Sequence, residues 1–228
     1  MSAPTAPPSG RPVVISLCDL TGVFTTPWVD AGYDAILVDP QHGFSSSDGR
    51  VTKLAMTVEE ALPDLGNVIR TGRVAFVAGW PPCTDLSGSG ARWWVDKRAK
   101  DYMFQAKAVA VAEQCRTVGL LSGAPWFVEN PVGALRRVFG PRDHVFDPCD
   151  FTALEPADNY TKETCLWTGG GFRMPPVQQN PELGTPDDRI HKAPPSAERA
   201  NFRSATPMGF ARAVFAANAA PILMEATA

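Results

Sequence analysis

Short apolar runs alternate with polar, glycine-containing turns along most of the chain. Strands are predicted from such runs at residues 12–17, 33–38, 74–78, 126–128 and 159–167. Helices are predicted from spacing and end signals at residues 27–32, 51–65, 101–118 and 207–218, whereas 41–49 is predicted to be a loop. Gly32 and Gly119 follow two of these helices, as glycine commonly does at helix ends. Strands alternating with helices predict an α/β fold, a mostly parallel sheet with helices on both faces.

The composition is that of one ordinary globular domain, with 228 residues of which 44% are hydrophobic and 20% charged. Residues 1–10 are rich in Ala, Pro and Ser and predict a disordered tail, so the domain spans 11–228, with a loop-rich insert at about 168–203. No apolar run approaches the ~20 residues of a membrane span. Five cysteines without a C-x-x-C pair indicate reduced thiols and a cytoplasmic protein. The three histidines are scattered and indicate no metal site.

A cysteine follows the predicted strand at 74–78 and is the sharpest landmark in the chain. Pro81 and Pro82 end any regular structure before it, because each fixes φ and lacks an N–H group. Cys83 comes next, on the edge of the sheet where open α/β folds bind ligands. A free cysteine is also commonly a small buried hydrophobe. Its position alone therefore leaves a structural and a chemical role open.

The first predicted strand opens into a turn of the nucleotide-binding type. The second strand closes on Asp39, roughly 20 residues further on, where a carboxylate can accept hydrogen bonds from ribose hydroxyls. The turn has a single glycine, Gly22, with Phe24 where a second glycine would stand. No backbone cradle for a pyrophosphate is therefore predicted. An ordinary turn of a βαβ unit is the alternative.

A second polar landmark, Glu129-Asn130-Pro131, follows the predicted strand at 126–128. Because the carboxyl ends of parallel strands share one edge, we expect Glu129 to lie one strand away from Cys83. On its own, Glu129 is equally a strand-end carboxylate in water.

Taken together, these stretches resemble the cytosine-C5 methyltransferase family. The segment Pro82-Cys83-Thr84-Asp85-Leu86-Ser87 is similar to its Pro-Cys catalytic loop, and Glu129-Asn130-Pro131 to its Glu-Asn-Val tripeptide. The first turn, Leu20-x-Gly22-x-Phe24, matches the family's aromatic-x-Gly-x-Gly motif in part. The chain looks like the short, phage-type relatives, which carry similar Pro-Pro-Cys-Thr and Thr-Cys-Leu-Trp stretches.

The resemblance spans roughly two-thirds of the chain and implies a Rossmann-like fold that binds S-adenosyl-L-methionine. The cofactor residues that it implies are Asp19, Thr21, Gly22, Phe24, Asp39 and Pro81. The substrate contacts that it implies are Pro82, Ser87, Arg92, Asn130, Lys162 and Thr164, the last two standing for the arginines of a Gln-x-Arg-x-Arg segment. Residues 203–207 are expected to return to the cofactor pocket, and the pair Trp93-Trp94 to stack on a base or to close the core.

The chemistry implied by the resemblance is covalent catalysis. The thiolate of Cys83 adds to C6 of cytosine, which makes C5 nucleophilic enough to take a methyl group. Glu129, in its protonated form, hydrogen-bonds N3 and the exocyclic amine and stabilises the charge that develops in the ring. Burial raises a carboxyl pKa and so favours that form.

The substrate is the least determined part of the prediction. DNA cytosine is the first expectation, but residues 168–203 are far shorter than the recognition region of duplex-specific members. The net charge of −3 is also a poor footprint for duplex binding. Single-stranded DNA, a free cytidine nucleotide, and DNA presented by a protein partner to this expected monomer stay open. A non-catalytic module that binds cofactor or nucleic acid is the alternative from another functional class.

Overall fold

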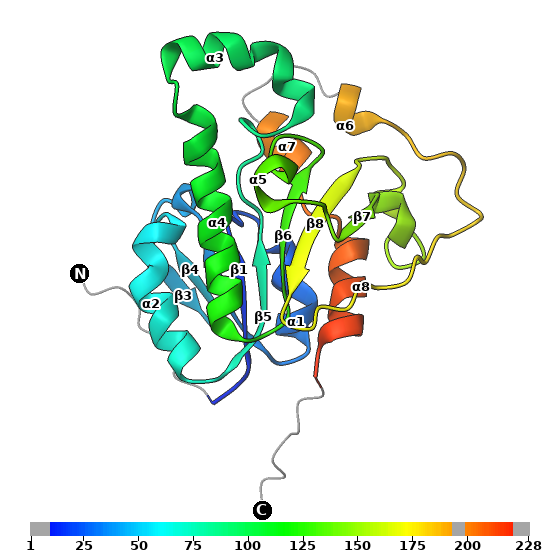
Figure 1. The fold of residues 1–228 in the computed structure, drawn as a ribbon. Coiled ribbons are helices and arrows are strands. Elements are labelled where there is room, and N and C mark those ends of the chain that lie inside the picture. Colours follow the sequence, from blue (N-terminus) through cyan, green and yellow to red (C-terminus); the bar gives the residue numbers. More distant parts are fainter. Residues whose placement is uncertain (1–9, 193–198, 221–228) are drawn as a thin grey trace, which may run out of the picture.

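The computed structural model describes residues 10–192 and 199–220, so the predicted tail lies outside the described residues apart from Gly10. An eight-stranded sheet forms its centre, in the order β3-β4-β2-β1-β5-β6-β8-β7 (Figure 1). The strands are β1 (Val13–Leu17), β2 (Asp34–Val38), β3 (Ser46–Asp48), β4 (Val51–Leu54), β5 (Val74–Gly79), β6 (Trp126–Pro131), β7 (His144–Phe146) and β8 (Thr164–Gly169).

The sheet is mixed but mostly parallel. The strands β4, β2, β1, β5 and β6 run parallel, whereas β3 is antiparallel to β4, and β8 is antiparallel to both β6 and β7. From β1 the chain first builds outward through β2 and β4 and then returns to the other side of β1 with β5. The switch point therefore lies between β1 and β5, where doubly wound sheets bind their ligands.

Helices cover both faces of the sheet, as the alternating pattern predicts. The α-helices are α1 (Thr26–Asp30), α2 (Val58–Arg70), α3 (Trp94–Lys100), α4 (Phe104–Ser122), α5 (Arg136–Phe139), α6 (Arg189–Lys192), α7 (Arg199–Ser204) and α8 (Met208–Asn218). The short 3-10 helices are η1 (Val23–Thr25), η2 (Pro40–His42), η3 (Gly88–Trp93), η4 (Pro148–Phe151) and η5 (Pro156–Asp158). α2 and α4 cover one face, α1 and α8 cover the other, and α3 lies beyond the upper edge of the sheet in Figure 1. The α/β prediction is confirmed.

Each face has its own core. Aliphatic side chains dominate between the sheet and the pair α2 and α4, with Leu17, Leu65 and Val128 fully buried. The opposite face is aromatic, and there the rings of Phe146 and Phe210 stack with centroids 3.9 Å apart. Side chains of this size supply most of the favourable free energy of folding, so the two cores fix the sheet that carries the site.

The predicted helix at 51–65 is wrong in its first part. Residues 51–54 form β4, whose alternating burial matches a strand, and α2 begins only at Val58. Thr57 caps α2 through a reciprocal capping box with Glu60, which fixes its start. The loop predicted at 41–49 contains η2 and the edge strand β3. The spacing of apolar residues gave the wrong prediction here, because a short apolar pattern fits both the helical and the strand period.

Three boundaries near the site also differ from the prediction. β8 begins only at Thr164, so residues 159–163 of the strand predicted at 159–167 precede it. α4 does not end at Gly119 but continues to Ser122, and Gly123 with φ 66° follows it. Gly119 is instead a contact residue, because a Cβ there would lie 2.5 Å from the Trp126 ring. β6 extends through Pro131, so Glu129 lies within the strand, opposite Leu166 of β8, rather than after it.

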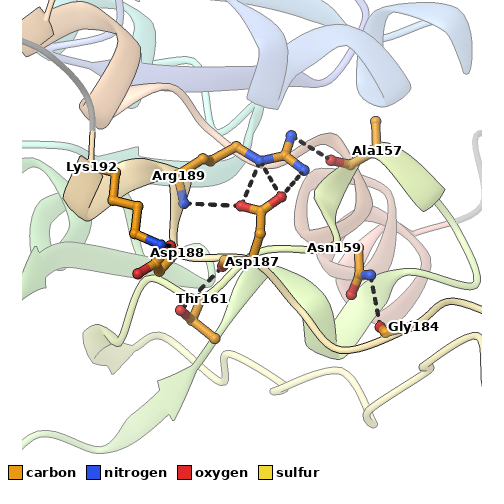
Figure 2. Close-up of polar contacts among 8 residues, drawn as sticks. All are labelled: Ala157, Asn159, Thr161, Gly184, Asp187, Asp188, Arg189 and Lys192. Carbon is orange, nitrogen blue, oxygen red and sulfur yellow. Dashed lines mark hydrogen bonds and ion pairs between the residues drawn. The ribbon is translucent and has the colours of Figure 1, made fainter.

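The described part of the predicted insert is fastened to the body by its own polar side chains. Residues 170–188 form no helix or strand, although Asp187 makes an isolated bridge with Tyr160. Arg189 forms an ion pair with Asp187 and donates to the Ala157 carbonyl, as Figure 2 shows. Asn159 donates to the carbonyl of Gly184 in the same cluster. The insert is thus a covering loop held against η5 and the residues before β8.

No helix within residues 10–192 and 199–220 is long and apolar enough to cross a membrane.

Candidate functional site

Cys83 and Glu129 lie at the carboxyl ends of two neighbouring parallel strands. β5 and β6 pair through Val77 with Trp126 and Gly79 with Val128. Glu129 is the next residue of β6, and Cys83 follows the end of β5 after Trp80 and two prolines. The expected meeting of the two residues on one edge of the sheet is therefore what the fold produces.

The loop that carries Cys83 is a tight turn pinned to the loop after β6. The Cys83 carbonyl accepts hydrogen bonds from Leu86 N at 3.0 Å and from Ser87 N at 2.8 Å. Gly88 N then donates to Val132 O at 2.8 Å, and Ala134 N donates to Leu86 O at 2.7 Å. These cross-loop bonds hold the Cys83 turn at a fixed position beside the end of β6.

Gly133 makes this close approach between the two loops possible. A Cβ at that position would lie 1.9 Å from the Leu86 carbonyl oxygen, which no real side chain tolerates. Only glycine lets two backbones come this close. The sequence signal is the glycine that follows Glu129-Asn130-Pro131-Val132, and we did not identify it from sequence.

Asn130 adds a side-chain link between the same two strand ends. Its Nδ2 donates to the Pro81 carbonyl at 3.0 Å, and the side chain is fully buried. Its Oδ1 is buried without a hydrogen-bond partner among the described residues. Pro81 lies two residues before Cys83, so this hydrogen bond gives Asn130 and Pro81 a role in positioning the Cys83 turn. The substrate contact expected of Asn130 and the cofactor contact expected of Pro81 stay predictions.

The Glu129 carboxyl group is withdrawn from water. The residue is 8% exposed, and Oε1 has no hydrogen-bond partner among the described residues. Burial raises the pKa of Glu129, and the positive charge of Lys162 acts in the opposite direction. The environment favours the protonated acid more than water does.

The Cys83 thiol shares this electrostatic environment. Burial and the nearby Glu129 carboxylate raise the pKa of Cys83, while the charges of Lys162 and Arg203 act to lower it. The four side chains come from four separate segments of the chain, and the folded sheet brings them within electrostatic reach of one another. Lys162 was expected from sequence. Arg203, on α7, was expected only as part of a segment returning to the pocket, and the Arg203 side chain lies near the thiol.

The turn after β1 is organised by Asp19. One carboxylate oxygen accepts hydrogen bonds from Thr21 N, Thr21 Oγ1 and Gly22 N, at 3.0, 3.1 and 2.8 Å. The other accepts from Ser16 Oγ at 2.7 Å, which in turn accepts from Trp80 Nε1 at 3.1 Å. Gly22 has φ 72°, a conformation that glycine adopts without strain. The Asp19 carboxylate therefore shapes the turn and links it to the residue before Pro81.

Asp39 lies where the sequence predicts, at the end of β2 on the same edge of the sheet. Its Oδ1 accepts from Gln41 N at 2.8 Å, which leaves Oδ2 without a hydrogen bond among the described residues. His42 lies nearby, and burial lowers the pKa of its imidazole, although the charge of Asp39 acts in the opposite direction. Sequence reasoning missed His42, whose only signal is its position three residues beyond Asp39.

Phe24 and Trp80 pack against each other beside the switch point. Phe24 is fully buried and makes edge-on ring contacts with Trp80 at 5.4 Å and with Phe127 at 5.4 Å. Its side chain therefore belongs to the aromatic core, and the expected cofactor contact would fall to its backbone. Trp80 is partly exposed and lies with its ring 5.0 Å from that of Phe127 on β6, and sequence reasoning gave it no role.

The remaining predicted substrate residues occupy different surroundings. Pro82 is exposed beside Cys83, and Ser87 is half-buried, with its hydroxyl 2.9 Å from that of Ser89. Thr164 is buried and donates to the Lys162 carbonyl at 2.7 Å, so it supports Lys162. Arg92 is exposed, and its guanidinium lies 5.0 Å from the ring of Trp93.

No family model matches the chain, and no curated protein matches it significantly.

Proposed function

We propose that the protein transfers a methyl group from S-adenosyl-L-methionine to C5 of cytosine in DNA, through a covalent bond between Cys83 and C6. The observation that carries the proposal is the pairing of Cys83 with Glu129. A thiol and a carboxyl group, each with a raised pKa, lie on adjacent strand ends under the influence of the same lysine. Perturbed groups that converge at a sheet edge are typical of functional sites.

The turn beside this pair fits the proposed cofactor by its chemistry. Residues 18–30 contain one glycine and no lysine or arginine, so the turn has neither a cradle nor a counter-charge for a phosphate. S-adenosyl-L-methionine has no phosphate and carries a positive sulfonium. Asp39 offers a carboxylate oxygen for a ribose hydroxyl, and the Gly22 turn offers backbone groups for the amino-acid end. When bound, the cofactor supplies the electrophilic methyl group that cytosine C5 takes up.

The protein's own contribution begins with the two protons held at Cys83 and Glu129. The Cys83 thiol gives its proton to solvent water, and the thiolate adds to C6: the C–S bond forms as the C5–C6 double bond opens and its electrons move toward C5 and N3. Glu129 in its acid form donates a hydrogen bond to N3 and so stabilises that charge. After C5 has been methylated, a water molecule takes up the C5 proton. The C5–C6 double bond re-forms, and the Cys83 thiolate leaves.

We propose that the positive charges of Lys162 and Arg203 stabilise the thiolate form of Cys83. Burial alone would hold Cys83 as a thiol, and a charged Glu129 would hold it more strongly. The two cations oppose both effects. When Glu129 is protonated its charge vanishes, so the acid form of Glu129 and the thiolate of Cys83 favour each other. This is the pair of states that the proposed step needs.

Methyl transfer from radiolabelled S-adenosyl-L-methionine tests the proposal directly. Duplex DNA, single-stranded DNA and dCMP are offered in parallel to the purified protein, and the labelled product is digested to nucleosides. The proposal predicts label in 5-methylcytosine and none with the Cys83→Ser variant. Label on an exocyclic amine, or none with any substrate, contradicts it.

A further inference from the structure

One surface of the molecule, the segment 88–107, is both aromatic and basic. It comprises η3, α3 and the first turn of α4, and it begins five residues after Cys83. In Figure 1 this arm rises above the carboxyl edge of the sheet, with α3 at the far end. The family resemblance implies a substrate contact at Arg92 and leaves base stacking open for Trp93-Trp94, but it gives residues 95–107 no role.

The arm exposes large side chains that a solvated helix does not need. Tyr102 is 80% exposed and Trp93 is 53% exposed, and Val95 and Met103 are exposed with them. Trp93 precedes α3 and Tyr102 follows it, so the seven residues of α3, roughly 10 Å of helix, separate the two residues along the chain. Rings at the two ends of a helix suit successive positions along one strand.

The charge of the arm is opposite to that of the whole chain. The net charge of the chain is −3, but the arm contains five basic residues and only two acidic ones. The basic residues are Arg92, Lys97, Arg98, Lys100 and Lys107, and the acidic residues are Asp96 and Asp101. Lys97 and Lys107 are used in ion pairs with Asp85 and Asp101, at 2.5 and 2.6 Å. The other three cations form no ion pair within the described part of the chain. Arg92 instead lies against the ring of Trp93.

The arm is tied to the turn that carries Cys83. Lys97 Nζ donates to the Thr84 carbonyl at 3.1 Å as well as to Asp85. Gln105 Nε2, on α4, donates to the Asp85 carbonyl at 3.2 Å. A polymer bound to the arm would therefore lie at a fixed position relative to the Cys83 thiol.

The insert is the weaker candidate for a reading surface, because several polar side chains in its described part are used internally. Gln179 donates to Asp150 at 3.1 Å, and Lys192 pairs with Asp188 at 2.8 Å. Arg189 is held by Asp187, as Figure 2 shows. Reading a duplex sequence needs side chains free to reach base edges in a groove.

We propose that the arm 88–107 is a docking surface for single-stranded DNA, with Trp93 and Tyr102 stacking on unpaired bases and Arg92, Arg98 and Lys100 contacting phosphates. Exposed aromatic rings among cations are how proteins hold single strands without reading their sequence. Duplex DNA offers no free base faces to such rings. The choice of DNA as the polymer rests on the proposed function, whereas the choice of a single strand rests on the arm.

Fluorescence anisotropy with a labelled 16-nucleotide oligonucleotide tests the docking surface without methyl transfer. Trp93→Ala and Tyr102→Ala each weaken the affinity for the single strand about 5- to 150-fold, the loss expected for one stacked base. Leu121→Ala is the matched control, an exposed apolar residue at the opposite end of α4, and it leaves the affinity unchanged. Binding is tighter to the single strand than to the same sequence as a duplex. Circular dichroism of each variant checks the fold.

Salt dependence tests the phosphate contacts. Three cations predict a slope of log K against log salt of about −2, at roughly −0.7 for each contact with a single strand. Replacing Arg98 and Lys100 with Glu reduces that slope to about −0.7, whereas Arg70→Glu, at the end of α2, does not change it. Tighter binding to duplex or to RNA of the same sequence, or a slope that the double variant does not change, overturns the proposal.

The arm and the proposed function fail in different ways. If methyl transfer to DNA proceeds but Trp93→Ala and Tyr102→Ala change neither single-strand affinity nor rate, the arm is refuted and the function stands. If arm-dependent binding is found without methyl transfer, the function is refuted and the arm stands. Light scattering tests whether a second copy of the chain occupies the arm instead. If the protein is a dimer that these variants convert to a monomer, with unchanged DNA affinity, the arm is a self-association surface and the proposal is overturned.

Discussion

Asn130→Ala is the substitution that most directly separates positioning from chemistry at this site. Asn130 is fully buried on β6, and Nδ2 makes the side-chain hydrogen bond to the Pro81 carbonyl at 3.0 Å. Without it, that carbonyl loses its partner in a place where water is excluded. The hydrogen bond holds the residues just before Cys83 against the strand that carries Glu129.

The expected loss of stability follows from the contact. Leaving a buried carbonyl unpaired costs about 1–3 kcal/mol, and a small cavity adds to this. Removing the unpartnered Oδ1 of Asn130 offsets part of the cost, since that atom is itself buried without a hydrogen bond. The net destabilisation expected for Asn130→Ala is therefore about 1–3 kcal/mol. This is a measurable fraction of the stability of an ordinary domain.

Urea denaturation measures this, because the free energy of unfolding follows from the midpoint and slope. Asn67→Ala is the control, an asparagine exposed on α2, and is expected to change stability by less than about 0.5 kcal/mol. The rate of methyl transfer by the folded variant should also fall, since the Cys83 turn is no longer fixed beside Glu129. A change below about 0.5 kcal/mol, with the rate of methyl transfer unaltered, would refute the positioning role.

Four further predictions address the chemistry. Cys83→Ser abolishes methyl transfer and leaves cofactor binding by calorimetry within a few-fold; substantial turnover would remove Cys83 from the mechanism. Asp39→Ala weakens S-adenosyl-L-methionine binding by about 1.5–3 kcal/mol, the cost of losing hydrogen bonds to a charged group, and an unchanged dissociation constant means the ribose is held elsewhere. Glu129→Gln lowers the pKa of Cys83 because it removes a negative neighbour, and Lys162→Ala raises that pKa because it removes a positive one. The pH dependence of Cys83 alkylation, followed by mass spectrometry, should therefore shift to lower pH in the first variant and to higher pH in the second. Bisulfite sequencing of DNA from expressing cells should give no four- to six-base consensus, and a pattern confined to one such motif would show that this chain reads sequence.

The two strand ends that carry the site could be predicted from sequence for local reasons. Each buried strand contains a short apolar run, and proline or polar residues follow that run, so Cys83 and Glu129 stand out without any knowledge of tertiary contacts. Their meeting on one edge follows from the geometry of parallel strands. Asp39 is predictable in the same way from the strand before it.

The features that sequence reasoning missed depend on contacts between distant segments. Gly133 is required by the Leu86 carbonyl, and Gly119 by the ring of Trp126, so neither marks a helix end or an ordinary turn. Residues 51–54 fit both a strand and a helix by spacing, and pairing with β2 decides between them. Arg203 lies 120 residues from Cys83 in the chain, and only the fold brings its charge to the thiol.

The central claim is a covalent bond between Cys83 and cytosine C6, and mechanism-based trapping tests it most directly. In an oligonucleotide containing 5-fluorocytosine, fluorine replaces the C5 proton whose loss precedes release of the thiolate, so the bond to Cys83 persists after methyl transfer. The account predicts a complex that resists denaturing electrophoresis, forms only with S-adenosyl-L-methionine and yields a peptide modified at Cys83. No complex, or a complex that still forms with Cys83→Ser, would contradict it.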